Sequence, residues 1–364
     1  MKKINFADPF IGKEERKFLL DAYNSKWISL GKYNKKLEEE SAKLFKKKYA
    51  LSVSNGTIAI NLALLSLNLD KDDEVIVPSL CYISPINVLK SLNFKIKVCK
   101  IDHSNFQIDL DHLNKAITKK TKAILLIYNY GNLPDLEKIK KISKKNKIFL
   151  IEDFSEALFS KYKKVNAGSV GDISTASFHA TKTITSGEGG IVLTNNKNIY
   201  TKMKKIREHG YYKKNEPYTY DMLGFNYKMS NLLAAIGYGQ LRKNKEIIKK
   251  KKSLFKSYLK FLNYPNIKNL SFLNKNETPI MWSIPYKVNS LKERNKLIKI
   301  LASKNIQVRP SFNMIYNYRH LNIKKIKEDN ISEKIILLPM HLKMSTKNVH
   351  FICQILNKYS TTKF

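Results

Sequence analysis

The chain has 364 residues, of which 43% are hydrophobic and 11% aromatic, and this composition is typical of a globular protein and not of a disordered chain. The formal net charge is +37, but nearly all cations are lysines spread along the whole chain. Arginine is the residue preferred for reading bases and phosphates, so we expect solvated helix faces and no nucleic-acid partner. A positive field of this kind attracts anionic substrates.

The three cysteines, Cys81, Cys99 and Cys353, form no CxxC pattern and no spacing with histidine that is typical of a metal site. We therefore expect neither a disulfide framework nor a metal centre. The first residues carry charge but lack the apolar stretch of an export signal, and no run reaches the ~18 apolar residues of a membrane helix. We expect a cytoplasmic protein without a membrane partner.

Short apolar runs alternate with helical patterns over the first two thirds of the chain. An amphipathic helix is expected to begin near Pro134, and continuous runs of Val, Ile and Leu separated by such helices predict a mostly parallel sheet covered on both faces. The predicted strands are residues 49–54, 74–78, 94–101, 122–128, 147–153, 172–178 and 190–196.

From about Met229 a single long helical pattern leads away from this sheet. It is followed by a strand, a helix, a short strand and a final helix, at 280–288, 291–304, 306–310 and 347–359. The fold class predicted is α/β, with a large sheet domain at 1–240 and a smaller α+β domain at 241–364.

In open α/β sheets, ligands bind at the carboxyl ends of the strands. The first strand ends in Asn55, Gly56 and Thr57, and a helix follows. The free N–H groups of a helix N-terminus suit a phosphate, and Gly56 lets it approach closely. An ordinary capped turn is the alternative, and the P-loop pattern of nucleotide triphosphatases is absent.

Two further strand ends carry candidate side chains. Asp153 directly follows a buried strand, where a carboxylate is costly without a cation or several donors. Its partner is either a protonated ring nitrogen of a ligand or the N-terminus of the next helix. We expect Glu152 beside it to be solvated. Tyr82 either stacks on a planar ligand or is a core aromatic.

Lys182 lies in the segment "SFHATKTITSGEGG" (177–190), where no other formally charged residue occurs before Glu188. A desolvated lysine is a nucleophilic amine that forms a Schiff base with an aldehyde. Ser177 is a second candidate for phosphate binding. These features together indicate a pyridoxal phosphate site: donors for a phosphate, an aromatic ring that can stack on the ligand, a carboxylate for a ring nitrogen, and an isolated lysine.

With these residues the sequence resembles the sugar aminotransferases of the DegT/DnrJ/EryC1/StrS family, which are pyridoxal phosphate enzymes of fold type I. The resemblance covers nearly the whole chain and is most specific at S-F-H-x-x-K-x-x-x-x-G-E-G-G. Other segments that carry it include "SNGTIAINLALLSL", "LIEDFSEA", "KIREHG" and "LPMHLKMS".

The resemblance implies that Lys182 is the catalytic residue and binds pyridoxal phosphate as a Schiff base. It also implies that Asp153 pairs with the ring nitrogen and that Tyr82 stacks on the ring. Thr57, Ile58 and Ser177 then bind the phosphate. Glu156 stands where the family usually has glutamine beside the cofactor's phenolic oxygen, so its carboxyl group must be protonated or find another donor.

A homodimer with composite active sites is also implied. Asn226 in "GFNYKM" then reaches the phosphate in the partner subunit, and Lys228 replaces an arginine of the family motif, which leaves its substrate role open. His179 either lines the substrate side or is structural. Arg309 contacts a substrate anion or is a surface residue of the small domain.

The expected reaction is transfer of the amino group of L-glutamate to a nucleotide-linked keto-sugar, giving an amino sugar for surface glycans. The segment "IQVRPSF" resembles perosamine-type 4-aminotransferases and favours a 4-keto-6-deoxyhexose. Two alternatives stay open at this point: a dehydratase of the same fold, in which histidine replaces the lysine, and a basic nucleic-acid-binding protein. The nucleotide and the sugar are not identified by the sequence.

Overall fold

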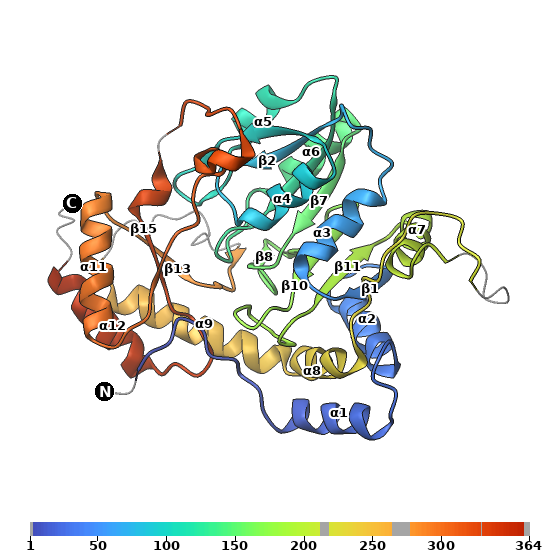
Figure 1. The fold of residues 1–364 in the computed structure, drawn as a ribbon. Helices are drawn as coiled ribbons and strands as arrows, with labels where there is room; N and C mark the ends of the chain where they lie inside the picture. Colours follow the sequence, from blue (N-terminus) through green and yellow to red (C-terminus); the bar gives the residue numbers. More distant parts are fainter. Residues whose placement is uncertain (1–2, 212–217, 264–276, 329, 360–364) are drawn as a thin grey trace.

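A seven-stranded sheet forms the centre of the computed structural model, which describes residues 3–211, 218–263, 277–328 and 330–359 (Figure 1). Its strand order is β1-β11-β10-β7-β6-β2-β3. β11 is antiparallel to β1 and β10, and the other neighbours are parallel, which confirms the predicted mostly parallel sheet. The strands are β1 (Tyr49–Val53), β2 (Glu74–Pro78), β3 (Lys95–Cys99), β6 (Thr121–Ile127), β7 (Phe149–Asp153), β10 (Ile173–Ser177) and β11 (Gly190–Thr194).

Helices cover both faces of the sheet because successive strand residues point to opposite sides. In β6, Ile124 and Leu126 belong to one core, while Ala123, Leu125 and Ile127 belong to the other. The first face is covered by α1 (Lys13–Asn24), α2 (Lys32–Leu44), α5 (Leu110–Ala116), α6 (Leu136–Asn146) and α8 (Asn231–Arg242), and the second by α3 (Gly56–Leu65), α4 (Ile83–Ser91) and α7 (Lys197–Arg207).

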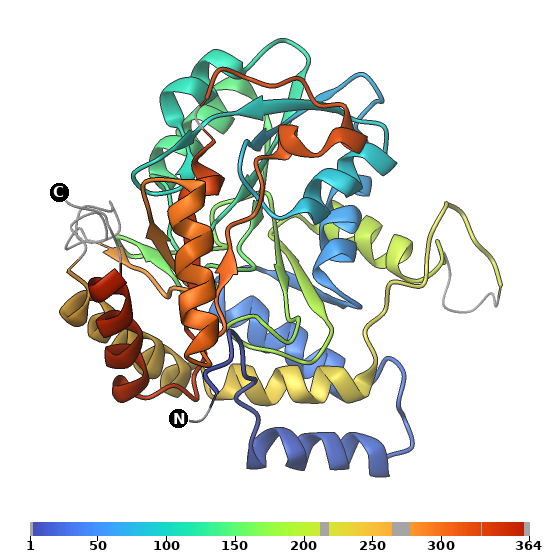
Figure 2. The same ribbon diagram turned by 60° about the vertical axis from the view of Figure 1, so that its left-hand side comes forward.

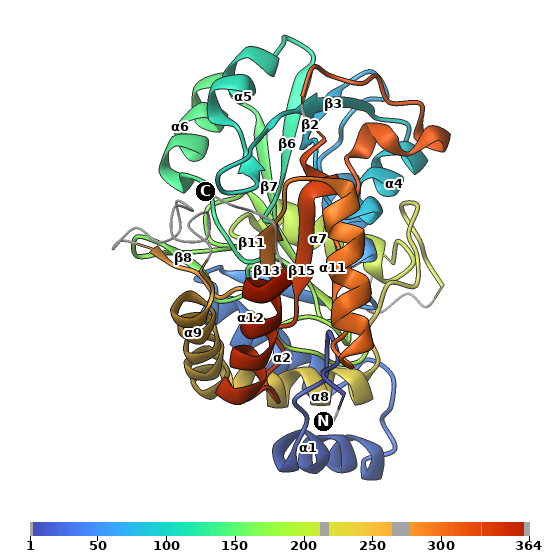
Figure 3. The same ribbon diagram turned by 90° about the vertical axis from the view of Figure 1, so that its left-hand side faces the viewer.

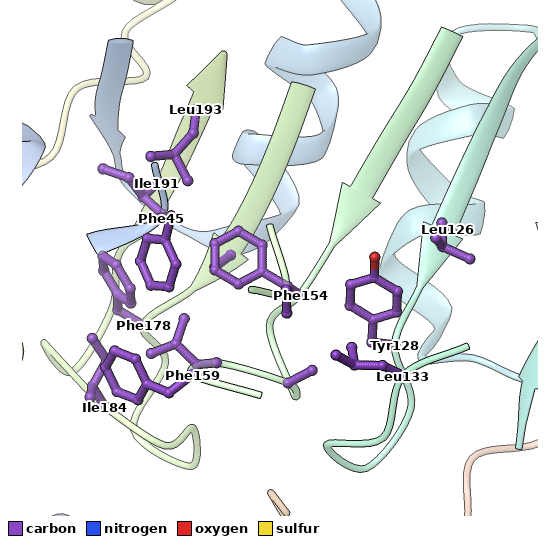
Figure 4. Packing of buried hydrophobic residues seen from close by; sticks show 14 of the residues in the cluster. Phe45, Leu126, Tyr128, Leu133, Phe154, Phe159, Phe178, Ile184, Ile191 and Leu193 are labelled. Atoms are coloured by element: carbon purple, nitrogen blue, oxygen red, sulfur yellow. The ribbon is translucent and has the colours of Figure 1, made fainter. Parts of the chain in front are cut away.

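The first core supports the segment that carries Lys182. Phe178 and Ile184 lie on either side of this lysine in the sequence and are both buried. Figure 4 shows them in one cluster with Phe45, whose ring meets that of Phe154 edge-on at a centroid distance of 4.8 Å. The loop is therefore fixed by packing on both sides of Lys182.

The last third of the chain forms a smaller α+β unit (Figures 2 and 3). Its sheet has the order β13-β15-β14. Its elements are α9 (Asn244–Phe261), β13 (Ile284–Lys287), α11 (Leu291–Ser303), β14 (Arg309–Pro310), β15 (Ile335–Leu338) and α12 (Thr346–Tyr359). The remaining strands are two residues long: β4 (Ile101–Asp102), β5 (Gln107–Ile108), β8 (Lys161–Tyr162), β9 (Val165–Asn166) and β12 (Glu277–Thr278).

The segment around Ile4 and Phe6 packs against this smaller unit. Ile4 forms a parallel bridge with Ile306, and both Ile4 and Phe6 are buried in the core formed by α9, α11, α12 and the small sheet. We propose that the boundary between the large and the small domain lies near residue 240, and that the segment around Ile4 and Phe6 packs on the small domain.

The structure corrects the prediction of one long helix after Met229. It contains two helices, α8 and α9, which are separated at Lys243. The side chain of Asn244 donates to the carbonyl of Leu241 at 2.7 Å. Asparagine side chains that bond the backbone in this way compete with the helical hydrogen bonds.

The prediction that Glu152 is solvated is wrong. Its side chain is fully buried in β7, where Oε1 accepts hydrogen bonds from the Tyr128 hydroxyl at 2.6 Å and from Gly168 N at 2.9 Å. Oε2 accepts from the backbone N–H groups of Val170 and Gly171 at 2.8 and 2.6 Å. Several strong donors satisfy the buried carboxylate, so its role is structural.

Candidate active site

A pocket of about 620 Å³ opens at the carboxyl ends of the parallel strands. Most of the residues predicted from the sequence meet there, although they come from distant parts of the chain. Those that line it are Gly56, Thr57, Ile58, Tyr82, Asp153, Glu156, Ser177, His179, Lys182 and Arg309.

One end of the pocket is the N-terminus of α3. The backbone of Gly56 lies so close to Ser177 that a Cβ atom at Gly56 would be 2.6 Å from the Ser177 Cβ. In the described part of the chain, the N–H groups of Gly56 and Thr57 have no hydrogen-bond acceptor. Free N–H groups at the positive end of a helix form an anion site.

The N–H group of Ile58 was predicted to bind the phosphate, but in the structure it has an acceptor within the chain. This N–H donates to the side chain of Asn55 at 2.9 Å, because Asn55 caps the helix. The hydroxyl of Thr57 lies 2.6 Å from that of Ser84. The N–H groups of Gly56 and Thr57 are thus available at this helix end, together with the hydroxyls of Thr57, Ser84 and Ser177. Ser84 was not predicted.

Asp153 lies at the end of β7 and is 7% exposed. Its Oδ1 accepts hydrogen bonds from Ser155 N at 3.0 Å and Ser155 Oγ at 2.5 Å. Burial raises the pKa of Asp153, although the bonds from Ser155 and the charge of Lys182 oppose this shift. Oδ2 has no donor among the described residues, so this carboxylate can still take a cationic N–H from a ligand.

Lys182 is held by a carboxylate and an aromatic ring. Its Nζ lies 3.0 Å from Oε1 of Glu156 and 4.6 Å from the ring centroid of Trp282. The Trp282 indole is fixed by a hydrogen bond from Nε1 to the carbonyl of Thr181 at 2.7 Å. Lys182 is thus oriented into the pocket, with its charge balanced by Glu156.

Aromatic rings line the side of the pocket that faces the small domain. The Phe312 ring stacks on that of Tyr130, and its edge contact with Tyr82 has a centroid distance of 5.7 Å. Tyr82 is 55% exposed, so most of its ring is available to a planar ligand. Beside this wall, the Arg309 guanidinium lies 4.5 Å from the ring centroid of Phe6, which holds this cation at the pocket.

His179 and Glu188 lie at the opening of the pocket. Nε2 of His179 is 3.6 Å from Oε1 of Glu188, and Nδ1 is 3.0 Å from Oγ1 of Thr181. Gly187 has φ +87°, a conformation that favours glycine, and it turns the chain toward β11. Both polar side chains therefore line the pocket.

Asn226 and Lys228 do not line the pocket of their own chain. Asn226 pairs with Glu208 through a backbone bridge, and Lys228 pairs in the same way with Val53 of β1. The role assigned to Asn226 depends on a second subunit and stays a prediction, and the role of Lys228 stays open.

Sequence reasoning missed the residues that orient the predicted ones. Ser155 could have been found, because a serine two residues after an aspartate commonly hydrogen-bonds to it. Tyr130, Trp282 and Phe312 could not, since tertiary contacts alone bring them to Lys182 and Tyr82.

No group of three or more His, Cys, Asp or Glu side chains that could bind a metal ion occurs in the described ranges. All three cysteines are buried and free. The helices that the structure describes include none long and apolar enough to cross a bilayer.

Solved structures of other proteins share this fold. PseC of Helicobacter pylori, an aminotransferase involved in the biosynthesis of pseudoaminic acid, has a TM-score of 0.91 at 25% identity and covers 99% of both chains. The PLP-form of the protein named "Putative sugar aminotransferase Spr1654" from Streptococcus pneumoniae has a TM-score of 0.90 at 25% identity, covering 99% of this chain and 100% of that one.

Sequence relatives agree with the structural ones. GDP-perosamine synthase of Escherichia coli O157:H7 is 35% identical over 371 residues and covers 100% of each chain. GDP-perosamine synthase of Vibrio cholerae is 32% identical, covering 97% of this chain and 98% of that protein. The model of the DegT/DnrJ/EryC1/StrS aminotransferase family matches residues 9–357. This chain belongs to that family.

Proposed function

We propose that the protein is a pyridoxal phosphate-dependent aminotransferase that moves the amino group of L-glutamate to a nucleotide-linked keto-sugar. The observation that supports this most is the pocket in which Lys182, Asp153 and the N-terminus of α3 meet. Family membership supports the same reaction class.

The residues present fit this cofactor. The close approach of Gly56 to Ser177 leaves room and donors for a phosphate. Asp153 has an oxygen without a donor at the other end of the pocket, which suits a protonated ring nitrogen. The exposed ring of Tyr82 suits stacking, and the amine of Lys182 suits reaction with an aldehyde.

Pyridoxal phosphate, when bound, supplies an aldehyde for the amines and a ring that accepts the electron pair released at Cα. Asp153 would hold the proton on the ring nitrogen. Lys182, once free as an amine, would remove the Cα proton of the amino donor and return it as a general acid. Packing of Phe178 and Ile184 would keep Lys182 in position through both proton transfers.

The substrate side of the proposal rests on the pocket opening. Arg309 would contact a substrate anion such as the diphosphate, while His179 would donate hydrogen bonds to sugar hydroxyls or accept them and the Glu188 carboxylate would accept them. The names of the two sequence relatives favour a GDP-linked 4-keto-6-deoxyhexose. A homodimer, with Asn226 reaching the partner's site, and a cytoplasmic location are parts of the proposal that stay predictions.

The lysine argues against the dehydratase alternative, in which histidine takes this position. The nucleic-acid alternative gains no support, because the family match extends across residues 9–357 and leaves no additional binding domain within that span.

Absorbance spectroscopy and a glutamate-dependent assay test the function. The purified protein should gain a visible band with pyridoxal phosphate, and it should aminate one member of a panel of GDP-, UDP- and dTDP-linked keto-sugars. Lys182→Ala should lose both the visible band and turnover. Turnover by Lys182→Ala at the wild-type rate would show that the catalytic assignment is wrong.

A further inference from the structure

Glu156 and Lys182 form a buried pair with one shared hydrogen bond. Their side chains are 7% and 16% exposed, and Nζ lies 3.0 Å from Oε1. The second oxygen, Oε2, accepts a hydrogen bond from the backbone N–H of Tyr130 at 2.9 Å. Glu156 is therefore fixed at one oxygen by the main chain and faces the lysine with the other.

The other ionisable groups that face Glu156 do not compete for this lysine. Burial raises the pKa values of the Tyr130 phenol and the Cys81 thiol, which keeps both neutral at physiological pH. Asp153 carries the remaining negative charge and already accepts two hydrogen bonds from Ser155. Among the described residues, Glu156 is thus the one carboxylate bonded to Lys182.

We propose that Glu156 controls the protonation state of Lys182 and takes up its proton when the lysine acts as an amine. This inference rests on the proposed role of Lys182. In the cofactor-free protein, Nζ of Lys182 donates its hydrogen bond to the Glu156 carboxylate, and the Trp282 ring lies beside the same nitrogen. In the transfer, an Nζ–H bond breaks, its electron pair stays on Nζ as the lone pair, and an Oε1–H bond forms.

The surroundings make Glu156 a competent acceptor. Burial raises the pKa of Glu156, while Lys182 and the Tyr130 N–H lower it. Once the ammonium ion is gone, the opposing charge of Lys182 is gone as well, and a buried carboxyl group beside Asp153 then favours its neutral, protonated form. The acid so formed can donate a hydrogen bond into the pocket, which resolves how a carboxyl group serves at this position.

The first experiment measures the reactivity of Lys182 itself. Full-length cofactor-free protein is labelled with trace 1-fluoro-2,4-dinitrobenzene across a pH series, and the Lys182 peptide is quantified by mass spectrometry. Because the reagent attacks only the amine, Glu156→Gln should move the midpoint of the Lys182 profile to lower pH. An opposite charge at this distance predicts labelling about tenfold faster or more at neutral pH.

Glu188→Gln is the matched control. Glu188 carries the same charge in the same loop, but its side chain is 60% exposed and is paired with His179. The Lys182 profile should not move in this variant. Equal profiles for wild type and Glu156→Gln, or an equal shift in both variants, would overturn the proposal.

Infrared spectroscopy gives a second measurement that does not require Glu156→Gln to fold. In cofactor-free Lys182→Ala, Glu156 loses its cation, so the C=O band of a protonated carboxyl group should appear at neutral pH. The absence of that band would contradict the proposal. Neither the labelling profile nor the infrared band depends on turnover. A negative result in these two measurements would contradict the role of Glu156 even if Lys182 gives the visible band, and loss of the visible band would contradict the role of Lys182 even if both measurements agree with the proposal.

Discussion

Gly56→Ala tests whether the close contact between α3 and β10 forms the phosphate site. An added Cβ would lie 2.6 Å from Cβ, 3.1 Å from Oγ and 3.2 Å from Cα of Ser177. Two of these atoms are at or next to the backbone, so a side-chain rotation cannot relieve the contact. Either Ser177 or the first turn of α3 must move.

The magnitude follows from two opposing effects. Alanine in place of glycine in a helix is usually stabilising by about 0.5–1 kcal/mol, whereas overpacking costs about 1–3 kcal/mol. We expect Gly56→Ala to lower the free energy of unfolding by roughly 1–2 kcal/mol. Loss of one hydrogen bond to a charged phosphate, about 1.5–3 kcal/mol, should weaken pyridoxal phosphate binding about tenfold to a hundredfold.

Gly237→Ala is the control. Gly237 lies inside α8, where a Cβ would meet the methyl groups of Leu37 at 3.5 Å and Ser186 at 3.6 Å, which is ordinary contact. Denaturant unfolding of the cofactor-free proteins and absorbance titration with pyridoxal phosphate measure both effects. Wild-type stability together with wild-type affinity in Gly56→Ala would refute the proposed cradle.

Two more substitutions separate ring chemistry from substrate binding. Burial raises the pKa of Asp153. The stability that its protonated form contributes is therefore present below the pKa of the unfolded chain and is lost as the pH rises through the pKa of the folded protein. Asp153→Asn should therefore stabilise the cofactor-free protein at neutral pH but not in acid, as measured by denaturant unfolding at both pH values, and should reduce turnover about a hundredfold or more. Neutral-pH stability below that of wild type would contradict this sign. Arg309→Ala should raise KM for the nucleotide sugar, while the rate of the half-reaction with glutamate, measured by stopped-flow absorbance, should stay unchanged. An equally large loss of activity in the glutamate half-reaction and in the sugar half-reaction would show that Arg309 does not act on the sugar substrate alone.

The sequence predicted the central sheet well because buried parallel strands are continuous apolar runs. β2 spans the predicted residues 74–78, five of the other six predicted strands of the first two thirds contain an observed strand, and β6 begins one residue before the predicted run 122–128. The break between α8 and α9 was missed because it depends on one side-chain bond from Asn244. Glu152 was misplaced because three of its donors lie in the loop at 168–171 and another is the Tyr128 hydroxyl, and no local pattern connects these to β7.

Site residues on strand ends were predictable, whereas their partners were not. Asp153, Ser177 and Lys182 follow directly from the edge at which parallel strands end. The sequence left an ordinary capped turn at this helix start as the alternative, and Asn55 does cap the helix by accepting the bond from Ile58 N. Trp282 reaches Lys182 from the other half of the chain because its backbone N–H donates to the carbonyl of Tyr130 at 2.8 Å.

The charges in the pocket specify the kind of ligand it accepts. Asp153 and Glu156 face a single ammonium ion, that of Lys182, and the hydrogen-bond pairing assigns that ion to Glu156. Asp153 is left as a buried anion without a cation, which is costly unless a ligand supplies one. At the other end, the N-terminus of α3 and Ser177 offer N–H and hydroxyl donors without a bound anion. A molecule with a protonated ring at one end and a phosphate at the other supplies a cation to Asp153 and an anion to the N-terminus of α3. A neutral ligand supplies neither, and a simple anion supplies only the second.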